Sequence, residues 1–431
     1  MLNRIAYMFL CVAVFAMPWE ETVKIVGNSR LPALAATGAC LAAVVAVAIS
    51  RQLRPLALFH AVAVAFLCWG VLSLFWSVDS GNTLARSATY AQLVLMTWLV
   101  WQFTADPGRQ RALMQAFVLG AFLTAGDMIR NYMHGVRYVS VEGYEHESFT
   151  SGLFRPNDVA FMLVLALPMA WYLAVRRGRG PMMWLNRLYV PVGMVGVFLT
   201  ASRGALIPAI FALSIVPLTM GKMKLRSRAM TAGLAIVVIP VTLAVVPQTS
   251  WDRLATTKSD LESGTMTHRR DIWRAGFEVF NQHPMAGVGP GNYEIAAGAY
   301  LDRPRPAHNA FLAVLVEQGT VGLLLFCALF VVGLKSLKCM PSLERRFWII
   351  LLLTLAIGLL PRNWDYKKPT WFVLAIFASA AASASAAARA VSASERRERM
   401  LTSGRLTFDE PPERGGWVAV GDLSPSNATA S

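Results

Sequence analysis

Residues 309–334 read NAFLAVLVEQGTVGLLLFCALFVVGL and contain one charged side chain, that of Glu317. A helix needs about 20 mostly apolar residues to cross the hydrocarbon core of a membrane, so this stretch predicts a membrane-spanning helix. Comparable runs recur from one end of the chain to the other and predict an all-α integral membrane protein with about 12 spans. The spans are expected at residues 5–19, 31–49, 56–78, 83–104, 110–130, 157–175, 186–201, 204–220, 229–247, 309–334, 346–361 and 369–391.

The charge pattern supports a membrane protein and excludes nucleic acid as a partner. Of the 431 residues, 55% are hydrophobic and 15% are charged, whereas a soluble domain carries about a quarter charged residues. The net charge of +15 comes from short basic clusters between apolar runs, which orient membrane proteins with these loops in the cytoplasm. An even number of spans puts both termini there. The clusters are Arg51 and Arg54; Arg109 and Arg111; Arg176, Arg177, Arg179 and Arg187; Lys222, Lys224, Arg226 and Arg228; Lys335, Lys338, Arg345 and Arg346; and Arg396, Arg397 and Arg399.

The predicted spans divide the chain into four parts. Residues 1–247 carry spans 1 to 9, and residues 308–391 carry spans 10 to 12. Residues 248–307 between them form a large loop on the outer side. Residues 392–431 form a polar cytoplasmic tail that is expected to be disordered. The first span lacks a small-residue cleavage site, so it is expected to remain in the protein.

Neither a metal site nor a disulfide framework is predicted. The five cysteines show no CxxC spacing, and no Asp-x-Asp pair occurs in the chain. Glu142, Glu145, His146 and Glu147 cluster in the first outer loop. Adjacent side chains diverge in regular structure, however, so a shared metal ion is the weaker interpretation of that cluster. We expect no metal and no cofactor.

The large outer loop contains an amphipathic segment. Residues 269–282, RRDIWRAGFEVFNQ, place Trp273, Phe277 and Phe280 at helical spacing. This predicts a helix that lies on the membrane surface or caps a cavity. It ends at residues 283–284, His-Pro, and a tight glycine turn follows at residues 287–291.

Three arginines are candidate anion binders. Arg203 lies in the short outer turn TASRGA at 200–205, where a cation usually has a partner. Its planar guanidinium can hold phosphate oxygens, although an arginine here can also extend to the lipid head groups. Arg269 and Arg270 begin the amphipathic helix, whose free N–H groups favour an anion. Arg269 shares a face with Trp273, so it is the better candidate if Trp273 points inward.

His308 is the candidate catalytic base. It lies in RPRPAHNAF at 303–311, just before a predicted span. The start of a helix favours a neutral imidazole near pH 7, as a general base requires. The alternative is a histidine that only forms hydrogen bonds at the membrane surface. Arg303 and Arg305 either add to a phosphate site or face water.

Other polar residues are candidates for structural or acceptor-side roles: Asn309, Glu317, Tyr293 and Asp365. A carboxylate inside a span, such as Glu317, is a functional candidate by default. In a continuous helix, however, Glu317 and His308 are nine residues apart and so point in opposite directions. We therefore favour Glu317 as a partner for another helix.

Four motifs in order carry a resemblance to a known family. They are SRGA (202–205), R-x-x-x-W (269–273), HPMAGVGPGNY (283–293) and HNAFLAVLVEQGTVGLL (308–324). In order and sidedness they resemble the O-antigen ligase and polymerase superfamily of bacterial envelopes. The resemblance is strongest to the O-antigen ligases.

The resemblance implies a membrane glycosyltransferase with a C-type, all-helical fold in the inner membrane of a Gram-negative bacterium, with its active site facing the periplasm. The donor would be O-antigen on undecaprenyl diphosphate, and the acceptor a sugar hydroxyl of lipid A–core. It also implies an inverting transfer without a metal ion. Arg203 and Arg269 would bind the diphosphate, and His308 would be the essential histidine. Because Arg270 is adjacent, the register of the second arginine stays open.

Three alternatives remain. A polymerase of the same superfamily would carry an Arg-x10-Gly pattern in two outer loops, and here it occurs once, from Arg253 to Gly264. A protein O-oligosaccharyltransferase often has an additional C-terminal region, whereas this tail is short. A transporter or flippase would place its charges at mid-membrane. Asp127, Asp158 and Glu317 leave that reading open.

Overall fold

The computed structural model shows a helical protein. It describes residues 2–19, 24–26, 29–51, 53–139, 145–146, 148–152, 155–221, 223, 225–226, 228–233, 236, 240, 248 and 269–405. Residues 1–385 form one compact unit, and residues 386–431 form a second. All that follows concerns the first unit, except that helix α16 continues into the second.

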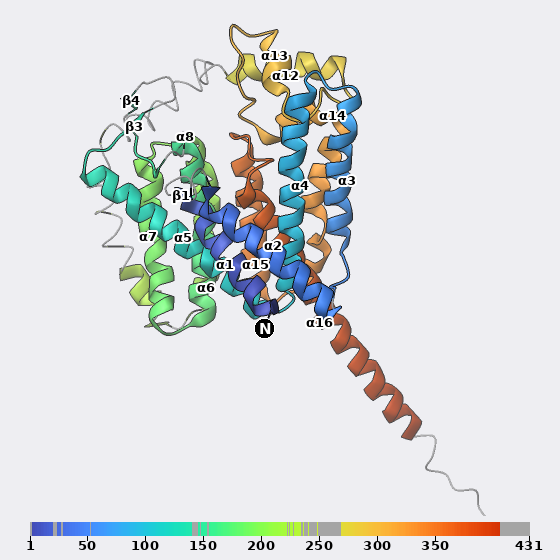
Figure 1. Cartoon of the computed structure of the whole chain (residues 1–431). Helices are drawn as coiled ribbons and strands as arrows, with labels where there is room; N and C mark the ends of the chain where they lie inside the picture. The colour runs from blue at the N-terminus through green and yellow to red at the C-terminus, as the bar shows by residue number, and fades with distance from the viewer. Residues whose placement is uncertain are drawn as a thin grey trace, which may run out of the picture. The chain divides into compact units, whose positions relative to one another are not determined.

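Helices make up nearly all of the described regular structure, which confirms the all-α fold class (Figure 1). The α-helices are α1 (Leu2–Ala16), α2 (Leu31–Ser50), α3 (Leu58–Leu72), α4 (Ser80–Phe103), α5 (Pro107–Met133), α6 (Pro156–Arg177), α7 (Pro181–Leu199), α8 (Arg203–Leu213), α9 (Ile215–Met220), α12 (Arg269–Gln282), α13 (Tyr293–Gly298), α14 (Ala310–Val331), α15 (Ser342–Leu359) and α16 (Lys368–Arg405). Short 3-10 helices cover Met17–Trp19, Ser73–Phe75 and Leu334–Cys339. Two small antiparallel pairs join β1 (Lys24–Val26) to β2 (Ser29–Arg30) and β3 (Tyr138–Val139) to β4 (Glu145–His146).

Among the described residues, eight helices are long and apolar enough to cross a membrane, fewer than the expected 12. Helices α4 and α15 occupy two more of the expected ranges, but they contain more polar and charged residues, among them Arg86 in α4 and Glu344, Arg345 and Arg346 in α15. The expected span at 31–49 is a shorter apolar helix, Leu34–Ile49. Most of the expected span at 229–247 lies outside the described residues. The chain is a multi-pass membrane protein.

Helix α6 is the centre of the bundle, because every residue from Val159 to Ala174 is buried. It packs against α5, α7, α8 and α15. Small residues allow the close approach that packing inside a membrane requires. A Cβ atom at Gly358 of α15, for example, would lie 1.9 Å from the Phe161 ring of α6. Tight packing therefore fixes the ends of α6 and α15 relative to each other.

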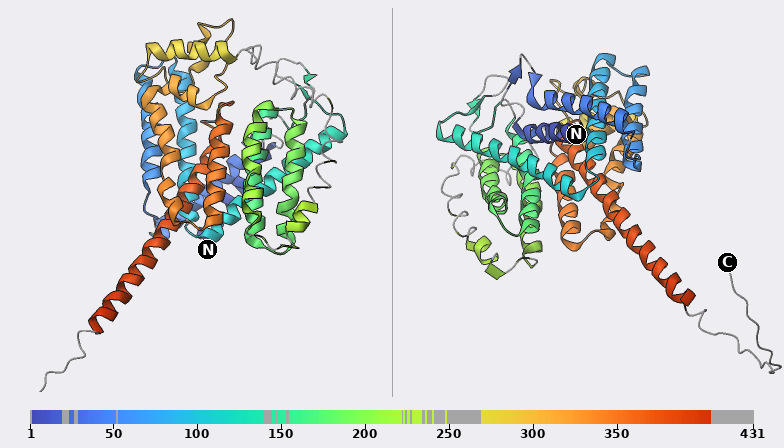
Figure 2. Two further views of the ribbon diagram at one scale, coloured as in Figure 1. Left: turned by 180° about the vertical axis from the view of Figure 1, so that it is seen from behind. Right: turned by 60° about the horizontal axis from the view of Figure 1, so that its bottom comes forward.

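Helices α12 and α13 lie across the ends of α3, α4 and α14 (Figures 1 and 2). Helix α12 spans the predicted segment, but the side chains that it buries are Ile272, Ala275 and Val279 rather than the aromatic ones. They pack on Val288 and on the first turns of α14. Phe277 is 50% exposed. Trp273 and Phe280 are partly buried against the same cluster, so two of the three predicted aromatic residues lie at the edge of the buried face.

Helix α14 is interrupted at Gly319, where φ is 67°. The interruption coincides with the glycine turn after α12. Two N–H groups of that turn donate to carbonyls before the break, Val288 to Val316 at 3.1 Å and Gly289 to Glu317 at 2.7 Å. A Cβ atom at Gly319 would lie 2.2 Å from the Met285 carbonyl oxygen. The glycine turn is thus packed directly against the broken helix.

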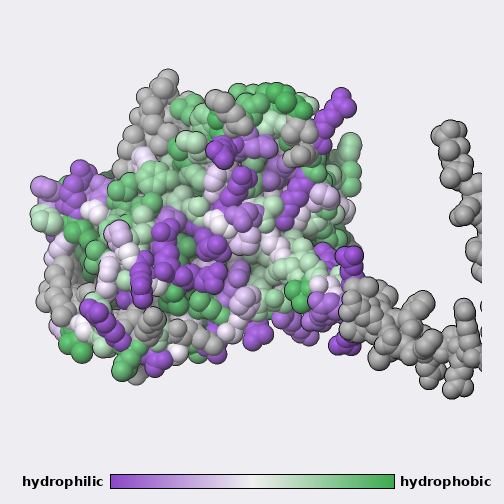
Figure 3. Space-filling view, turned by 90° about the horizontal axis from the view of Figure 1, so that it is seen from below, coloured by the Kyte–Doolittle hydropathy of each residue, from purple (hydrophilic) through white to green (hydrophobic). Residues whose placement is uncertain are grey.

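The opposite end of the bundle is basic. Arg176 and Arg177 end α6, and Arg345 and Arg346 lie in the first turn of α15. All four are exposed. Figure 3 views this end and shows hydrophilic side chains gathered among hydrophobic ones. The expected cytoplasmic location of this face remains a prediction.

Candidate active site

Several helices end around the turn that joins α15 to α16. Arg362, in this turn, is 3% exposed, and its guanidinium donates to three backbone carbonyls. These are Asn157 at 3.0 Å in α6, Gly204 at 3.3 Å in α8 and Gly358 at 3.0 Å in α15. Burial lowers the pKa of Arg362 to about 10, so it stays charged at neutral pH. Arg362 therefore holds the starts of α6 and α8 against the end of α15.

Arg203 is the first residue of α8 and is half-buried. It follows Ser202, whose backbone is extended, and Ala201, whose φ is 50°. The sharp turn formed by these two residues separates α7 from α8. Arg203 thus lies at a helix start, where N–H groups without a helical partner favour an anion.

Arg269 lies near Arg203. It is the first residue of α12 and is half-buried, whereas Arg270 is exposed. Burial lowers the pKa of Arg269, and the charge of Arg203 lowers it further. Trp273, one turn later, donates its indole N–H to the Ala307 carbonyl at 3.0 Å. This bond ties α12 to the segment that carries His308.

His308 immediately precedes helix α14 and has an unusual backbone. Its φ is 49°, in the left-handed region that few residues other than glycine adopt. Asn309 is the N-cap of α14, and its side-chain oxygen accepts from the N–H groups of Phe311 and Leu312. The Asn309 N–H donates to Asn363 Oδ1 at 3.1 Å. His308 is therefore flanked by residues that are fixed by hydrogen bonds.

The surroundings keep the His308 imidazole neutral. Burial lowers its pKa to about 4, and the charges of Arg269, Arg155 and Arg305 contribute, while Asp158 opposes them. A neutral imidazole at pH 7 can accept a proton, which is what general-base catalysis requires. Its low pKa also makes it a weak base until an anion offsets the neighbouring positive charge.

Among the residues that the structure describes, the arginines around His308 outnumber the acids. We call this set the arginine cluster: Arg155, Arg203, Arg269, Arg305 and Arg362. The carboxylate among them is Asp158, which accepts the Trp364 indole N–H at 2.7 Å. Gathering like charges is costly unless an anion binds there. The arrangement is therefore suited to a phosphate or diphosphate group.

The predicted binding residues fall into two groups. Arg203, Arg269 and Arg305 lie in the arginine cluster, whereas Arg270 and Arg303 are exposed. Sequence reasoning missed Arg155 and Arg362. The signal for Arg362 was present, because it lies in a short turn between two apolar runs, the same context that singled out Arg203.

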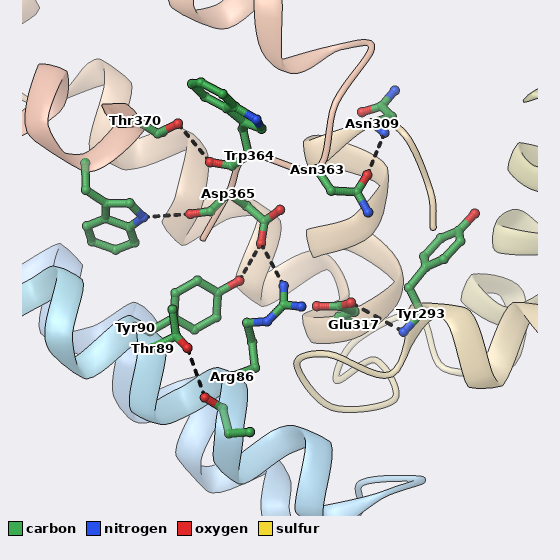
Figure 4. Close-up of polar contacts among 12 residues, drawn as sticks. Arg86, Thr89, Tyr90, Tyr293, Asn309, Glu317, Asn363, Trp364, Asp365 and Thr370 are labelled. Carbon is green, nitrogen blue, oxygen red and sulfur yellow. Dashed lines mark hydrogen bonds and ion pairs between the residues drawn. The ribbon is translucent and has the colours of Figure 1, made fainter. Parts of the chain in front are cut away.

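Glu317 and Asp365 belong to a second polar cluster (Figure 4). Arg86 of α4 lies between them, with its Nη1 3.8 Å from Asp365 Oδ2. Tyr90 donates to the same Asp365 oxygen at 2.7 Å, and the Tyr293 N–H donates to Glu317 at 3.3 Å. Glu317 therefore faces α4 and α13. Sequence reasoning did not single out Arg86.

Some predicted features remain untested. Within the described residues, no group of three or more His, Cys, Asp or Glu side chains could hold a metal ion. Glu142 and Glu147, from the acidic cluster of the first outer loop, lie outside the described residues, as does the pair Arg253 and Gly264.

The chain is thus a multi-pass, all-helical membrane protein with a cationic, histidine-containing site at one end of its helices. Residues 188–327 match the family described as O-antigen ligase. The chain is also similar to the O-antigen ligase of Pseudomonas aeruginosa, at 26% identity over 344 residues, which cover 76% of this chain and 78% of that protein. Both matches support membership of the O-antigen ligase superfamily, whose name points to a glycosyltransferase-type enzyme.

Proposed function

We propose that this protein is an O-antigen ligase of the bacterial inner membrane. It transfers O-antigen polysaccharide from undecaprenyl diphosphate to a sugar hydroxyl of lipid A–core on the periplasmic side. The observation that carries the proposal is the proximity of Arg203, Arg269 and His308 within one arginine cluster. A lipid diphosphate supplies negative charge to five arginines that share the Asp158 carboxylate.

The transfer is a single displacement. The acceptor hydroxyl oxygen attacks the anomeric carbon of the donor, and the bond from that carbon to the diphosphate oxygen breaks. Undecaprenyl diphosphate leaves with the bonding electron pair, and the hydroxyl proton passes to the His308 imidazole. The anomeric configuration is inverted. The donor is already activated, so no nucleotide is needed.

Each group in the site has a role in this reaction. Negative charge grows on the departing diphosphate, and guanidinium groups fixed beforehand stabilise it without rearranging. Arg203 and Arg269 are placed for this role, and Arg362 adds a buried positive charge beside Gly204. General-base catalysis by His308 contributes about 10²–10⁴-fold. No step requires a metal ion.

We infer the orientation of the protein in the membrane from the charged residues at the two ends of the helix bundle. The arginine cluster lies where α6 and α8 begin, and exposed basic residues lie at the other end of α6. The positive-inside rule places the basic end in the cytoplasm. The arginine cluster then faces the periplasm, where both lipid-linked substrates are available.

Reconstitution tests the proposal. The full-length protein in lipid nanodiscs is mixed with undecaprenyl-diphosphate-linked O-antigen and lipid A–core, with EDTA and without nucleotide. We expect transfer, and its loss in His308→Ala and Arg203→Ala. His283→Ala is the matched control, because His283 is exposed and lies just after α12, so it should keep full activity.

The acceptor separates the proposal from its alternatives. Full transfer by folded His308→Ala would overturn the assigned mechanism. Extension of one lipid-linked glycan by another, with lipid A–core left unmodified, would identify a polymerase instead. Movement of lipid-linked glycan across the bilayer without any new glycosidic bond would identify a flippase.

A further inference from the structure

Four consecutive residues in the turn between α15 and α16 each hold a different part of the site. Arg362 holds α6 and α8, and Asn363 accepts the Asn309 N–H. Trp364 donates to Asp158, and Asp365 accepts from Tyr90 of α4. Figure 4 shows the bonds of Asn363 and Asp365 on two sides of the turn. The site is therefore organised around residues 362–365.

His308 needs such support because its backbone is strained. A left-handed backbone is unfavourable for a residue other than glycine and persists only where its surroundings hold it. Two bonds do so here. The Ala307 carbonyl accepts from Trp273 at 3.0 Å, and the Asn309 N–H donates to Asn363 at 3.1 Å. Losing the second bond frees one side of the histidine.

Arg362 plays the corresponding part for Arg203. Its Nη1 donates to the carbonyl of Gly204, the residue that follows Arg203, at 3.3 Å. A Cβ atom on Gly204 would lie 3.2 Å from Pro361 and 3.9 Å from Arg362 Nη2, so the turn lies directly against this helix start. Arg362→Lys keeps the positive charge, but a single ammonium group cannot reproduce the three hydrogen bonds that the planar guanidinium donates to backbone carbonyls.

We propose that Asn363 and Arg362 are positioning residues of the transfer site and that they divide the task. Asn363 fixes His308 and thereby sets kcat. Arg362 fixes Arg203 and thereby sets the KM for the lipid-linked donor. This inference rests on the proposed function, in which His308 acts on the attacking hydroxyl and Arg203 on the donor diphosphate.

Kinetics distinguish this division of roles from general destabilisation. Misplacing a catalytic group by about 1 Å can cost 10²-fold in rate. We therefore expect Asn363→Ala to lower kcat by about 10–100-fold with little change in donor KM. Arg362→Lys keeps the positive charge that stabilises the departing diphosphate but loosens Arg203, which binds the diphosphate both before and during the reaction. It should therefore raise donor KM by about 10-fold and change kcat less.

Two further variants control for folding. Asn363→Asp keeps an acceptor oxygen for the Asn309 N–H, so it should recover most of the kcat lost in Asn363→Ala. Asn186→Ala removes a buried amide pair of 2.8 Å with Gln115, far from the turn. It should lower the melting temperature as Asn363→Ala does but leave both kinetic constants within about two-fold.

A chemical readout works without substrates. Diethyl pyrocarbonate acylates neutral imidazoles, and peptide mass spectrometry reports His308 by itself. In the wild type, Arg155, Arg269, Arg305 and Asp158 surround the ring, and we expect acylation to persist well below pH 6.5. In Asn363→Ala the loosened ring should behave more like an ordinary histidine, with acylation lost nearer pH 6.5.

The outcomes separate the inference from the proposed function. If the wild type transfers glycan and His308→Ala does not, the function stands. If Asn363→Ala then matches Asn186→Ala in kcat and in its acylation profile, Asn363 has no positioning role. If Arg362→Lys lowers only kcat, the division of roles is wrong. If the wild type transfers nothing, the acylation profiles still test whether Asn363 holds His308.

Discussion

Ala201 and His308 have the same left-handed backbone, with φ of 50° and 49°. Each stands immediately before the N-cap residue of a helix, Ser202 for α8 and Asn309 for α14. One of these turns presents Arg203 and the other presents His308 itself. Both of the central side chains in the proposed site therefore depend on a turn that the chain holds in an unfavourable conformation.

Ala201→Gly should stabilise the protein, because glycine adopts positive φ without steric cost. Ala201 is buried at 8% exposure, so the β-branched Ala201→Val should be destabilising, by about 1–2 kcal/mol or more. Melting temperatures in one detergent should rise for Ala201→Gly and fall for Ala201→Val. A lower melting temperature for Ala201→Gly would contradict the strain argument.

The pH dependence of transfer should reflect the low pKa of His308. An ordinary histidine loses its neutral form below about pH 6.5, but His308 keeps it to about pH 4. The acid limb of kcat/KM should thus lie near pH 4. Arg269→Gln removes a charge that lowers this pKa, so the limb should move towards pH 6.5.

The same shift makes folding pH-dependent. Between the two pKa values the unfolded chain binds a proton at His308 and the folded chain does not. This contribution to stability is present above about pH 6.5 and declines as the pH falls towards 4.

Arg270→Gln is the control for Arg269→Gln in the pH profile of transfer. Arg270 is exposed, so this variant should leave the acid limb of kcat/KM unchanged.

Arg269 and Arg270 should differ sharply in donor binding. Arg269 is half-buried near Arg203 and His308, whereas Arg270 is exposed. A hydrogen bond to a charged group contributes about 1.5–3 kcal/mol, which corresponds to roughly 10–100-fold in binding. Arg269→Ala should raise donor KM by about this factor, and Arg270→Ala by less than about three-fold. Equal effects would mean that Arg270 also contacts the donor.

Gly319→Ala should lower the melting temperature far more than Gly135→Ala does. The two glycines have similar φ, 67° and 70°, but the ψ of −170° at Gly319 lies in a backbone region that is essentially restricted to glycine, so a side chain there adds backbone strain. A Cβ atom at Gly319 would strike the Met285 carbonyl oxygen at 2.2 Å, whereas one at Gly135 meets nothing within 4 Å. The difference in melting temperature measures the combined effect of this backbone conformation and the close packing of the glycine turn.

The sequence predicted most of what depends on local patterns. The run at 309–334 became α14, Ala310–Val331, and the segment 269–282 became α12. Hydrophobic periodicity and the stop at His283-Pro284 suffice for such elements. The sequence alone could not decide that Arg269 is half-buried and Arg270 exposed, because both residues begin the same helix. The folded structure was needed to distinguish them.

Features that depend on distant contacts were not predictable in this way. A glycine inside a helix lowers helix stability by only about 1 kcal/mol relative to alanine. Gly319 alone therefore does not predict a break in the helix. The break is set by the turn at 287–291, about 30 residues earlier in the chain. Likewise, Asn363 looks like an ordinary turn residue until its oxygen is seen to accept the Asn309 N–H.

The hydrogen bonds from Val288 and Gly289 to the carbonyls of Val316 and Glu317 make two distant stretches one unit. Chimeras between relatives must respect that unit. A graft of residues 283–292 from another enzyme has to bring residues 316–320 from the same source. Otherwise the transplanted loop packs against a break in α14 whose shape is matched to a different loop. Exchanging this loop between such enzymes therefore means exchanging both segments.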